Sequence, residues 1–393
     1  MTCARPLAVC VALLVAAGAC AAAIERTPGA RWEHCAPQQA GWDAAGLRKA
    51  VAYAVAHESR RPRDLALEQR LTFGREPHGE AIGPFAPRGD MTGVVVHHGC
   101  IVAQWGEPAR VDMAHSVTKS LLSSVVGVAW DRSLIRNLDA PVSDDVPPMR
   151  ALDGSPIDLF ATPHNRAITW DHLLRQTSGW EGTLWGKPDW ADRAAGPPPA
   201  ASIAERAAPG STWQYNDVRT NVLALAALGV WRRPLPQVLK ETVLDPIGAS
   251  HTWRWIGYEN AVVTIDGRVL ASVPGGGHWG GGLFISAHDL ARFGLLTLRG
   301  GRWGSRQVLS RRWVALALTP TPAHPGYGFM NWYLNRDRAL YPSAPASAFA
   351  HIGNGANVIF VDPEHDLVVV LRWIEDEAVD GVLARLLGAL PSR

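Results

Sequence analysis

Apolar and polar residues alternate in two patterns near the start of the chain. Apolar residues at helical spacing over residues 42–58 predict an amphipathic helix. Residues 93–106 hold two runs of β-branched residues on either side of a short polar turn, which is typical of a β-hairpin. The stretch between these two elements, residues 59–91, is rich in arginine, proline and glycine and is expected to be an irregular connection.

A third apolar segment follows the hairpin almost directly. Its apolar residues, from Leu121 to Trp130, recur at helical spacing. This pattern predicts a buried helix that begins near Ser116.

The pattern changes after residue 130. Residues 131–290 alternate short helical patterns, at 170–176, 200–207 and 221–228, with loops rich in proline and glycine. A helix is then predicted at 287–299, strands at 327–334, 357–361 and 367–373, and a closing helix at about 377–390. Strand patterns at both ends with helices between them predict an α+β fold, in which one sheet is assembled from both ends of the chain. The α/β part would cover about 40–130 and 291–393, and the mainly helical insertion about 131–290.

Composition narrows the range of partners. The chain has 393 residues, a net charge of +2 and 19% charged residues. This balance argues against a nucleic-acid surface and favours a small-molecule partner.

The first 23 residues resemble an export signal. Arg5 precedes an apolar run over residues 7–17, and the small residues Ala21 to Ala23 suggest cleavage after Ala23. Lipoprotein processing at Cys20 is the alternative. No later segment has the length of a membrane span, so we expect residues 24–393 to form a soluble protein in the bacterial periplasm. The two cysteines of that part, Cys35 and Cys100, could form a disulfide or remain as thiols.

Candidate chemistry begins at the start of the buried helix, where Lys119 follows Ser116 by three residues. On a helix this spacing carries both side chains to one face, where a lysine can take the proton of a serine hydroxyl. The backbone N–H groups at the helix N-terminus could then stabilise an oxyanion. The alternative is a capped helix with an ordinary surface lysine.

Two later stretches carry further polar groups. Residues 209–217 read Pro-Gly-Ser-Thr-Trp-Gln-Tyr-Asn-Asp and contain Tyr215, while residues 351–355 read His-Ile-Gly-Asn-Gly. In this order, the three segments resemble the serine β-lactamase and penicillin-recognising superfamily, especially its class C branch, which includes D-alanyl peptidases, family VIII carboxylesterases and nylon-oligomer hydrolases. Residues 168–180 and 280–286 also resemble this branch, so the resemblance covers roughly residues 90–375.

The resemblance implies a β-lactamase/transpeptidase-like fold with an antiparallel sheet, and an acyl-enzyme mechanism without a metal or organic cofactor. Ser116 would attack an ester or amide carbonyl, and Lys119 with Tyr215 would receive and relay the proton. The N–H groups of Ser116 and Asn354 would form the oxyanion hole, with Gly353 in the same strand and His351 facing the pocket. An ester is the first choice of substrate, an amide or peptide the second and a β-lactam the third.

Two residues depart from the pattern of the family. Asp217 replaces a usual asparagine, so an acceptor-only carboxylate stands where an amide could donate hydrogen bonds. It could pair with Lys119 or favour a cationic substrate group. His351 replaces a lysine, which removes a permanent cation that could hold the carboxylate of a β-lactam.

Several alternatives remain open. Tyr215 could be an ordinary core residue, and a protein that keeps this fold could bind ligands without turning them over. Residues 275–280 formally fit G-x-G-x-x-G but are interpreted as a flexible loop beside the pocket, and no His-Glu-x-x-His metal motif is present. Residues 180–193 are the best candidate for a substrate-facing loop, and one or two nearby tryptophans could line an apolar pocket. Nothing in the sequence fixes the oligomeric state.

Overall fold

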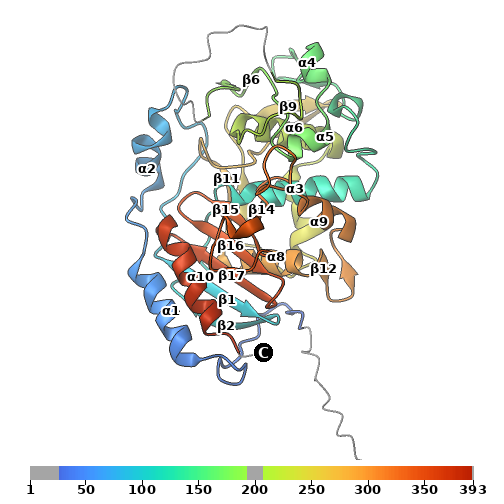
Figure 1. Cartoon of the computed structure of the whole chain (residues 1–393). Helices are drawn as coiled ribbons and strands as arrows, with labels where there is room; N and C mark the ends of the chain where they lie inside the picture. Colours follow the sequence, from blue (N-terminus) through green and yellow to red (C-terminus); the bar gives the residue numbers. More distant parts are fainter. Residues whose placement is uncertain (1–25, 193–206, 392–393) are drawn as a thin grey trace, which may run out of the picture.

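The computed structural model describes residues 26–192 and 207–391 (Figure 1). The predicted signal peptide, with its Cys20 alternative, lies outside the described residues, as does all but the last residue of the predicted helix 200–207. Among the described residues, no helix is both long and apolar enough to cross a membrane.

A six-stranded antiparallel sheet joins the two ends of the chain. Its strand order is β14-β15-β16-β17-β1-β2. Strand β1 pairs along its whole length with β17, so that Val95 faces Val369. The predicted sheet assembled from both ends is therefore confirmed. The strands are β1 (Thr92–His97), β2 (Cys100–Trp105), β14 (Tyr333–Leu334), β15 (Phe349–Gly353), β16 (Asn357–Asp362) and β17 (Leu367–Arg372).

Helices cover both faces of this sheet. On one face, α1 (Ala44–Ala56) and α10 (Val379–Gly388) pack together, and on the other lies α8 (Ala287–Leu298) (Figure 1). Alternate residues of β17 belong to the two apolar cores, with Val369 facing α1 and α10, and Val368 facing α8. Because both faces are covered, β16 and β17 are buried at every position, and their central residues read as continuous apolar runs.

Helix α3 (Val117–Asp131) runs between the sheet and the helical part (Figure 1). It is buried from Val117 to Ala129, since it contacts β15 on one side and α6 and α7 on the other. Helix α6 is buried on all sides as well. Such all-round burial explains why neither helix shows a polar stripe. The helices of this part are α4 (Pro163–Arg166), α5 (Trp170–Leu174), α6 (Asp217–Trp231), α7 (Leu235–Leu239) and the π-helix η4 (Lys240–Leu244), and α9 (Arg311–Ala317) follows α8 along the chain.

Short strands also lie outside the six-stranded sheet, most of them in the helical part, and the sequence did not predict them. Most have only two to four residues, which is too short for an alternating pattern to be recognised. They form sheets in the orders β10-β9-β4-β5, β3-β11-β8, β12-β13 and β6-β7. Their bounds are β3 (Asp112–Met113), β4 (Met149–Arg150), β5 (Pro156–Ile157), β6 (Thr183–Leu184), β7 (Lys187–Pro188), β8 (Arg254–Ile256), β9 (Val262–Ile265), β10 (Arg268–Ala271), β11 (Gly282–Ile285), β12 (Arg302–Trp303) and β13 (Arg306–Gln307).

Two predicted segments differ from the structure. The connection at 59–91 contains α2 (Leu65–Leu71) and the 3-10 turn η1 (Phe73–Arg75), because the Asp64 side chain accepts hydrogen bonds from two N–H groups of the first turn. Only Tyr333–Leu334 of the predicted strand 327–334 is extended. A turn replaces the rest, and the Asn331 N–H donates to Tyr327 Oη at 2.7 Å.

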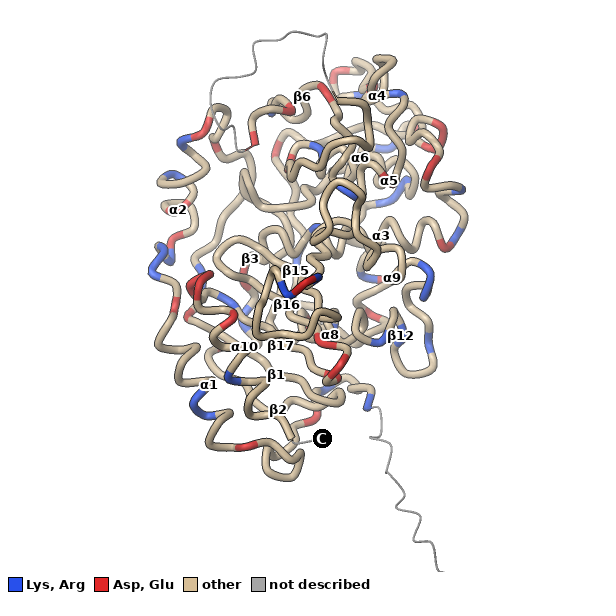
Figure 2. Tube along the Cα trace, in the orientation of Figure 1, with Lys and Arg blue, Asp and Glu red and all other residues tan. Residues whose placement is uncertain are grey.

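Basic and acidic residues are interspersed over the outer helices and loops of the trace (Figure 2). No face of one sign is visible in this view of the described residues.

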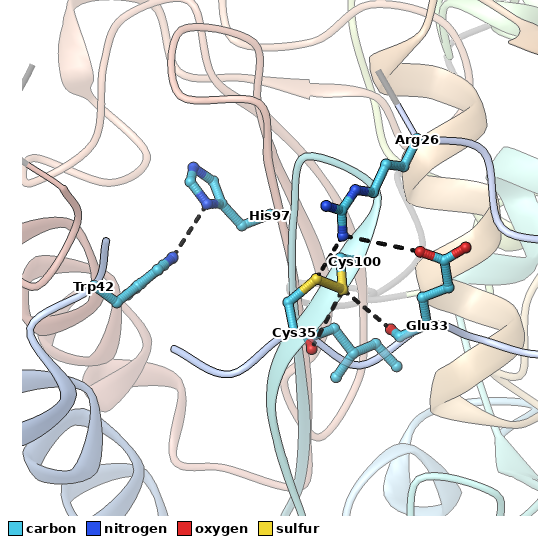
Figure 3. Close-up of a disulfide and its surroundings, with 7 residues drawn as sticks. Arg26, Glu33, Cys35, Trp42, His97 and Cys100 are labelled. Carbon is cyan, nitrogen blue, oxygen red and sulfur yellow. Dashed lines mark hydrogen bonds and ion pairs between the residues drawn. A yellow bond between two sulfur atoms is a disulfide. The ribbon is translucent and has the colours of Figure 1, made fainter. Parts of the chain in front are cut away.

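A disulfide joins Cys35 to Cys100, with their Cα atoms 6.0 Å apart (Figure 3). It attaches the N-terminal arm to β2, where the Ile101 N–H also donates to the Glu33 carbonyl oxygen. Of the two alternatives left by the sequence, the structure therefore has the disulfide.

We expect replacement of both cysteines by serine to lower the free energy of unfolding by about 4 kcal/mol, because the disulfide closes a long loop in the unfolded chain. Urea denaturation without reductant would measure this loss. Reduction of the unaltered protein should produce a similar loss, and equal midpoints for all three samples would contradict the prediction.

Candidate active site

The N-terminus of α3 opens into a cavity of about 360 Å³. Ser116 is the N-cap residue of this helix and is half-buried at the cavity wall. The residue before it, His115, has a left-handed φ of 47° and also lines the cavity. The complete lining consists of Phe73, His115, Ser116, Tyr215, Asp217, Gly277, His278, Tyr333, Ile352, Gly353, Asn354 and Asp376.

Lys119 lies one helical turn after Ser116 and on the same face of α3, as the helical spacing predicted. Its Nζ is 3.0 Å from Ser116 Oγ, and its side chain is fully buried. The same Nζ forms an ion pair with Asp217 Oδ1, and the Asp217 side chain is only 4% exposed. Of the two roles considered for Asp217, the structure therefore has the pairing with Lys119.

Tyr215 reaches the same lysine from the segment before α6. The Lys119 Nζ lies 4.7 Å from the centroid of the Tyr215 ring. The backbone there is fixed by Asn216, whose side chain caps α6 by accepting from the Arg219 N–H. The N–H of Asn216 in turn donates to Gln176 Oε1. A local capping interaction thus places the tyrosine next to the serine–lysine pair.

The end of β15 passes close to the backbone of Ser116. A Cβ atom at Gly353 would overlap the carbonyl oxygen of Ala114 and would lie 3.2 Å from the Ser116 nitrogen. Only glycine permits this approach. Asn354 follows at the cavity wall, and its side chain accepts from Arg61 and donates to Glu68.

His351 does not face the cavity, so that prediction is wrong. Its side chain is fully buried against Phe293, Trp332 and Phe349, at ring-centroid distances of 5.2, 4.8 and 5.7 Å. Burial lowers the pKa of His351 to about 3, which leaves the ring neutral at pH 7. Ile352, the next residue of the strand, lines the cavity instead, because successive side chains point in opposite directions.

His115 is also neutral at pH 7. Burial lowers the pKa of His115 to about 3, and the charge of Arg372 adds to this effect. The residue beside Ser116 therefore adds no positive charge to the cavity.

Three residues that sequence reasoning gave no chemical role lie beside Asp217. His278 Nε2 is 3.0 Å from Glu76 Oε2, and His278 Nδ1 is 3.2 Å from Asp192 Oδ1 and 3.6 Å from Asp217 Oδ2. Asp192 also accepts a hydrogen bond from the Asp217 N–H. The side chains of His278 and Asp192 are 1% and 0% exposed. We call Glu76, Asp192 and His278 the His278 cluster.

The sequence held weak signals for two of these residues. Asp192 belongs to the expected substrate-facing loop at 180–193, of which the last residue is not described. His278 belongs to the loop at 275–280, which was interpreted as flexible but is buried at every position. A Cβ atom at Gly276 would lie 2.5 Å from Lys119 Nζ, so glycine lets this loop pass directly beside the site. Glu76 has no such signal, because the sequence predicts only an irregular connection at residues 59–91.

The family assignment follows from the comparison with known proteins. The family model described as Beta-lactamase matches residues 87–382, which is most of the chain. The chain belongs to the beta-lactamase family. Its fold is the β-lactamase/transpeptidase-like fold that the three segments implied.

Among the relatives of this beta-lactamase family member is a provisionally named D-alanyl-D-alanine carboxypeptidase from Escherichia coli O157:H7. It is 24% identical over 196 residues, and the match covers 42% of the chain and 45% of the relative. The chain thus matches less than half the length of that curated relative.

Two solved structures have the same fold. A provisionally named 6-aminohexanoate-dimer hydrolase from Bacillus anthracis has a TM-score of 0.54 and 17% identity, with 77% of this chain and 80% of that chain covered. EstCE1, described as a hydrolase with promiscuous acyltransferase activity, has a TM-score of 0.52 and 16% identity, with 88% and 99% covered. At these identities the likeness concerns the fold alone.

The cavity wall of this beta-lactamase family member is mixed in character. Phe73, Tyr333 and Ile352 supply apolar surface beside the polar and charged residues of the lining. None of the tryptophans at 180, 185, 190, 213 and 279 lines the cavity, so the expected tryptophan wall is absent from this part of the described structure.

We expect Gly353→Ala to lower kcat/KM for an ester by about 10²-fold, because the added methyl group would displace the strand from the Ser116 nitrogen. Steady-state kinetics would measure the loss. Gly388→Ala is the matched control, since no atom lies within 4 Å of a Cβ at that helical position. Equal activity of the Gly353 variant and the control would contradict this account of the contact.

Proposed function

We propose that the protein is a serine hydrolase that cleaves an ester or amide through an acyl-enzyme intermediate. The 3.0 Å contact between Lys119 Nζ and Ser116 Oγ at the wall of the cavity is the observation that carries this proposal. A serine becomes a useful nucleophile when a neighbouring group can take its proton, and this lysine is within hydrogen-bond distance.

The proton path uses three side chains. Ser116 Oγ attacks the substrate carbonyl carbon while its proton moves to Lys119 and Lys119 passes one of its own protons to Asp217. Tyr215 then delivers a proton to the leaving group and takes one back from Lys119, which regains its proton from Asp217. The close contact of the Tyr215 ring with Lys119 supports this exchange. Water then cleaves the acyl-enzyme, with Tyr215 as its base.

We further propose that the N–H groups of Ser116 and Asn354 hold the oxyanion. The N-cap position of Ser116 supports this role, because backbone N–H groups at a helix N-terminus favour negative charge. Gly353 lies close to the Ser116 backbone nitrogen, so the backbone nitrogen of the next residue, Asn354, is also brought near it. Asp217 would act through Lys119, whereas His351 is too deeply buried to bind substrate directly.

An ester with a small apolar acyl group is the preferred substrate class. Phe73 and Ile352 offer apolar surface to such a group. A β-lactam ranks below an amide or peptide, because the neutral, buried His351 supplies no cation for a carboxylate. The carboxypeptidase-like relative lends support to the peptide class.

We also propose that the protein is exported to the periplasm. The disulfide between Cys35 and Cys100 supports this location, since disulfides persist in oxidising compartments. The amino-terminal 23 residues would serve as the signal peptide.

The test is hydrolysis of p-nitrophenyl butyrate by the purified protein, with parallel labelling by a fluorophosphonate probe. We expect turnover, and a peptide mass showing the probe on Ser116. Absence of both would overturn the proposal.

The second candidate function is a binding or sensor protein that does not turn over its ligand. The ion pair between Lys119 and Asp217 favours it, because an ammonium group has no lone pair with which to accept the Ser116 proton directly. Binding of an ester or penicillin without product release would distinguish this candidate from the enzyme.

A further inference from the structure

Asn354, the proposed second oxyanion donor, lies in a turn that its own sequence leaves loosely defined. The turn follows β15 and reads Gly353-Asn354-Gly355, and Gly355 has a left-handed φ of 74°. Glycine has the widest range of backbone conformations, so a glycine on each side would let the Asn354 peptide rotate. An oxyanion hole requires a fixed direction, because its N–H groups must point at the oxygen before the charge develops. Contacts from outside the turn must therefore fix the Asn354 N–H.

One such contact fixes the Asn354 carbonyl group. The Asn357 side chain donates from Nδ2 to the Asn354 carbonyl oxygen at 2.7 Å, and Asn357 Oδ1 accepts from Arg372 Nε at 2.7 Å. Arg372 is only 1% exposed and also donates to the carbonyl oxygens of Ile285 and Met113, at 2.6 and 2.8 Å. The peptide group after Asn354 is thus tied to the core.

A second set of contacts holds the Asn354 side chain. Arg61 Nη1 donates to Asn354 Oδ1 at 2.5 Å, and Asn354 Nδ2 donates to Glu68 Oε1 at 3.3 Å. Arg61 and Glu68 also contact each other, with 3.3 Å between Nη1 and Oε1, which closes a ring of three side chains. Asn354 is therefore held through its carbonyl group and through both polar atoms of its side chain, which leaves its N–H a single direction.

The Arg61 guanidinium is suited to this task by its shape more than by its charge. Its Nη2 donates to Asp376 Oδ2 at 3.2 Å, while Nη1 contacts Asn354 and Glu68. The two carboxylates offset its charge, and the planar group presents its N–H donors at fixed angles. Arg61 is not one of the described residues that line the cavity, so it acts on a substrate through Asn354 and Asp376, which do line it.

We propose that Arg61 is a positioning residue for the hydrolase reaction, which holds the Asn354 N–H in the direction of the oxyanion. The inference rests on the proposed function. When Ser116 Oγ bonds to the carbonyl carbon, the π electron pair of the C=O bond moves to the oxygen, which accepts from the N–H groups of Ser116 and Asn354. Without the Arg61 contact the Asn354 N–H can turn away. The transition state then loses stabilisation, while the substrate is bound as before.

The experiment is a double-mutant cycle in the full chain, with Arg61→Ala, Asn354→Ala and both changes together, measured on p-nitrophenyl butyrate. Asn354→Ala keeps the backbone N–H and removes the side chain that Arg61 holds. We expect each single variant to lower kcat by about tenfold with KM nearly unchanged, because a contact made mainly in the transition state weakens. The double variant should lose no more than either single variant, because Arg61 acts through Asn354.

Inhibition by phenylboronic acid gives a readout that a merely structural role would not change. A boronic acid adds to the serine oxygen as a tetrahedral adduct that resembles the intermediate, so its inhibition constant depends on the oxyanion contacts. In Arg61→Ala we expect this constant to rise by the factor by which kcat/KM falls, about tenfold. A partly unfolded sample would instead reduce the fraction of protein labelled by a fluorophosphonate and leave the inhibition constant of the remaining sites unchanged.

Arg60→Ala is the matched control, because Arg60 is the neighbouring arginine and pairs with Glu375 at 3.3 Å. Its kcat and inhibition constant should equal those of the unaltered protein. An unchanged kcat in Arg61→Ala, or a double variant whose loss is the product of the two single losses, would overturn the inference. If Arg61→Ala does not fold, Arg61→Lys takes its place in the cycle, since lysine keeps the charge without the planar group. An unaltered protein with neither turnover nor labelling would instead refute the proposed function.

Discussion

Ser116→Ala is expected to lower kcat/KM for p-nitrophenyl butyrate by about 10⁴-fold or more. Without the hydroxyl group no acyl-enzyme can form, and only binding and oxyanion contacts remain to favour the reaction. The fold should be unaffected, because Ser116 makes no side-chain capping bond to α3. Circular dichroism and thermal unfolding of the variant would check this point beside the kinetics.

Ser123→Ala is the matched control for this prediction. Ser123 lies on the same helix and is fully buried, and its hydroxyl has no hydrogen-bond partner within the described part of the chain. Its loss should leave turnover unchanged. Equal rates for Ser116→Ala and the unaltered protein would locate the esterase chemistry elsewhere, and the acyl-enzyme mechanism would have to be abandoned.

The second large effect is expected for Lys119→Met, which acts on activity and on stability at once. Activity should fall by about 10³-fold, because the group that receives the serine proton is gone. The free energy of unfolding should fall by about 3 kcal/mol, because the buried Asp217 carboxylate loses its ammonium partner. Steady-state kinetics and urea denaturation would measure the two losses.

The double variant Lys119→Met with Asp217→Asn separates these two losses. Removing the carboxylate removes the unpaired buried charge, so most of the stability should return. The activity should not return, because neither new side chain can take a proton from Ser116. Recovery of activity in the double variant would show that the lysine acts only by stabilising the fold.

The sequence by itself determined much of the architecture. The β1–β2 hairpin is where the β-branched runs predicted it, with His98 and Gly99 at positive φ in the turn. Strands β16 and β17 and helix α8 also agree with their predicted ranges. These elements are local: each depends on residues within one turn or run, which periodicity can report. The spacing of Ser116 and Lys119 is local in the same sense, since one helical turn brings them together.

Only the tertiary structure decided which charged groups surround Ser116 and Lys119. The His278 cluster joins Glu76 after η1, Asp192 before α6 and His278 before β11, which are far apart along the chain. No periodic pattern links such residues, and each one alone resembles an ordinary surface or loop residue. They meet because burial leaves polar groups no water to bind, so they must find partners across the fold.

The direction of His351 was decided in the same way. The three-residue pattern at 351–353 gives the strand but not the packing of α8 and Trp332 around it. Those apolar partners come from distant segments and enclose the ring, so a histidine expected at the pocket became part of the core. Local spacing therefore determined which side chains could react. Long-range packing determined which apolar and charged residues surround those side chains.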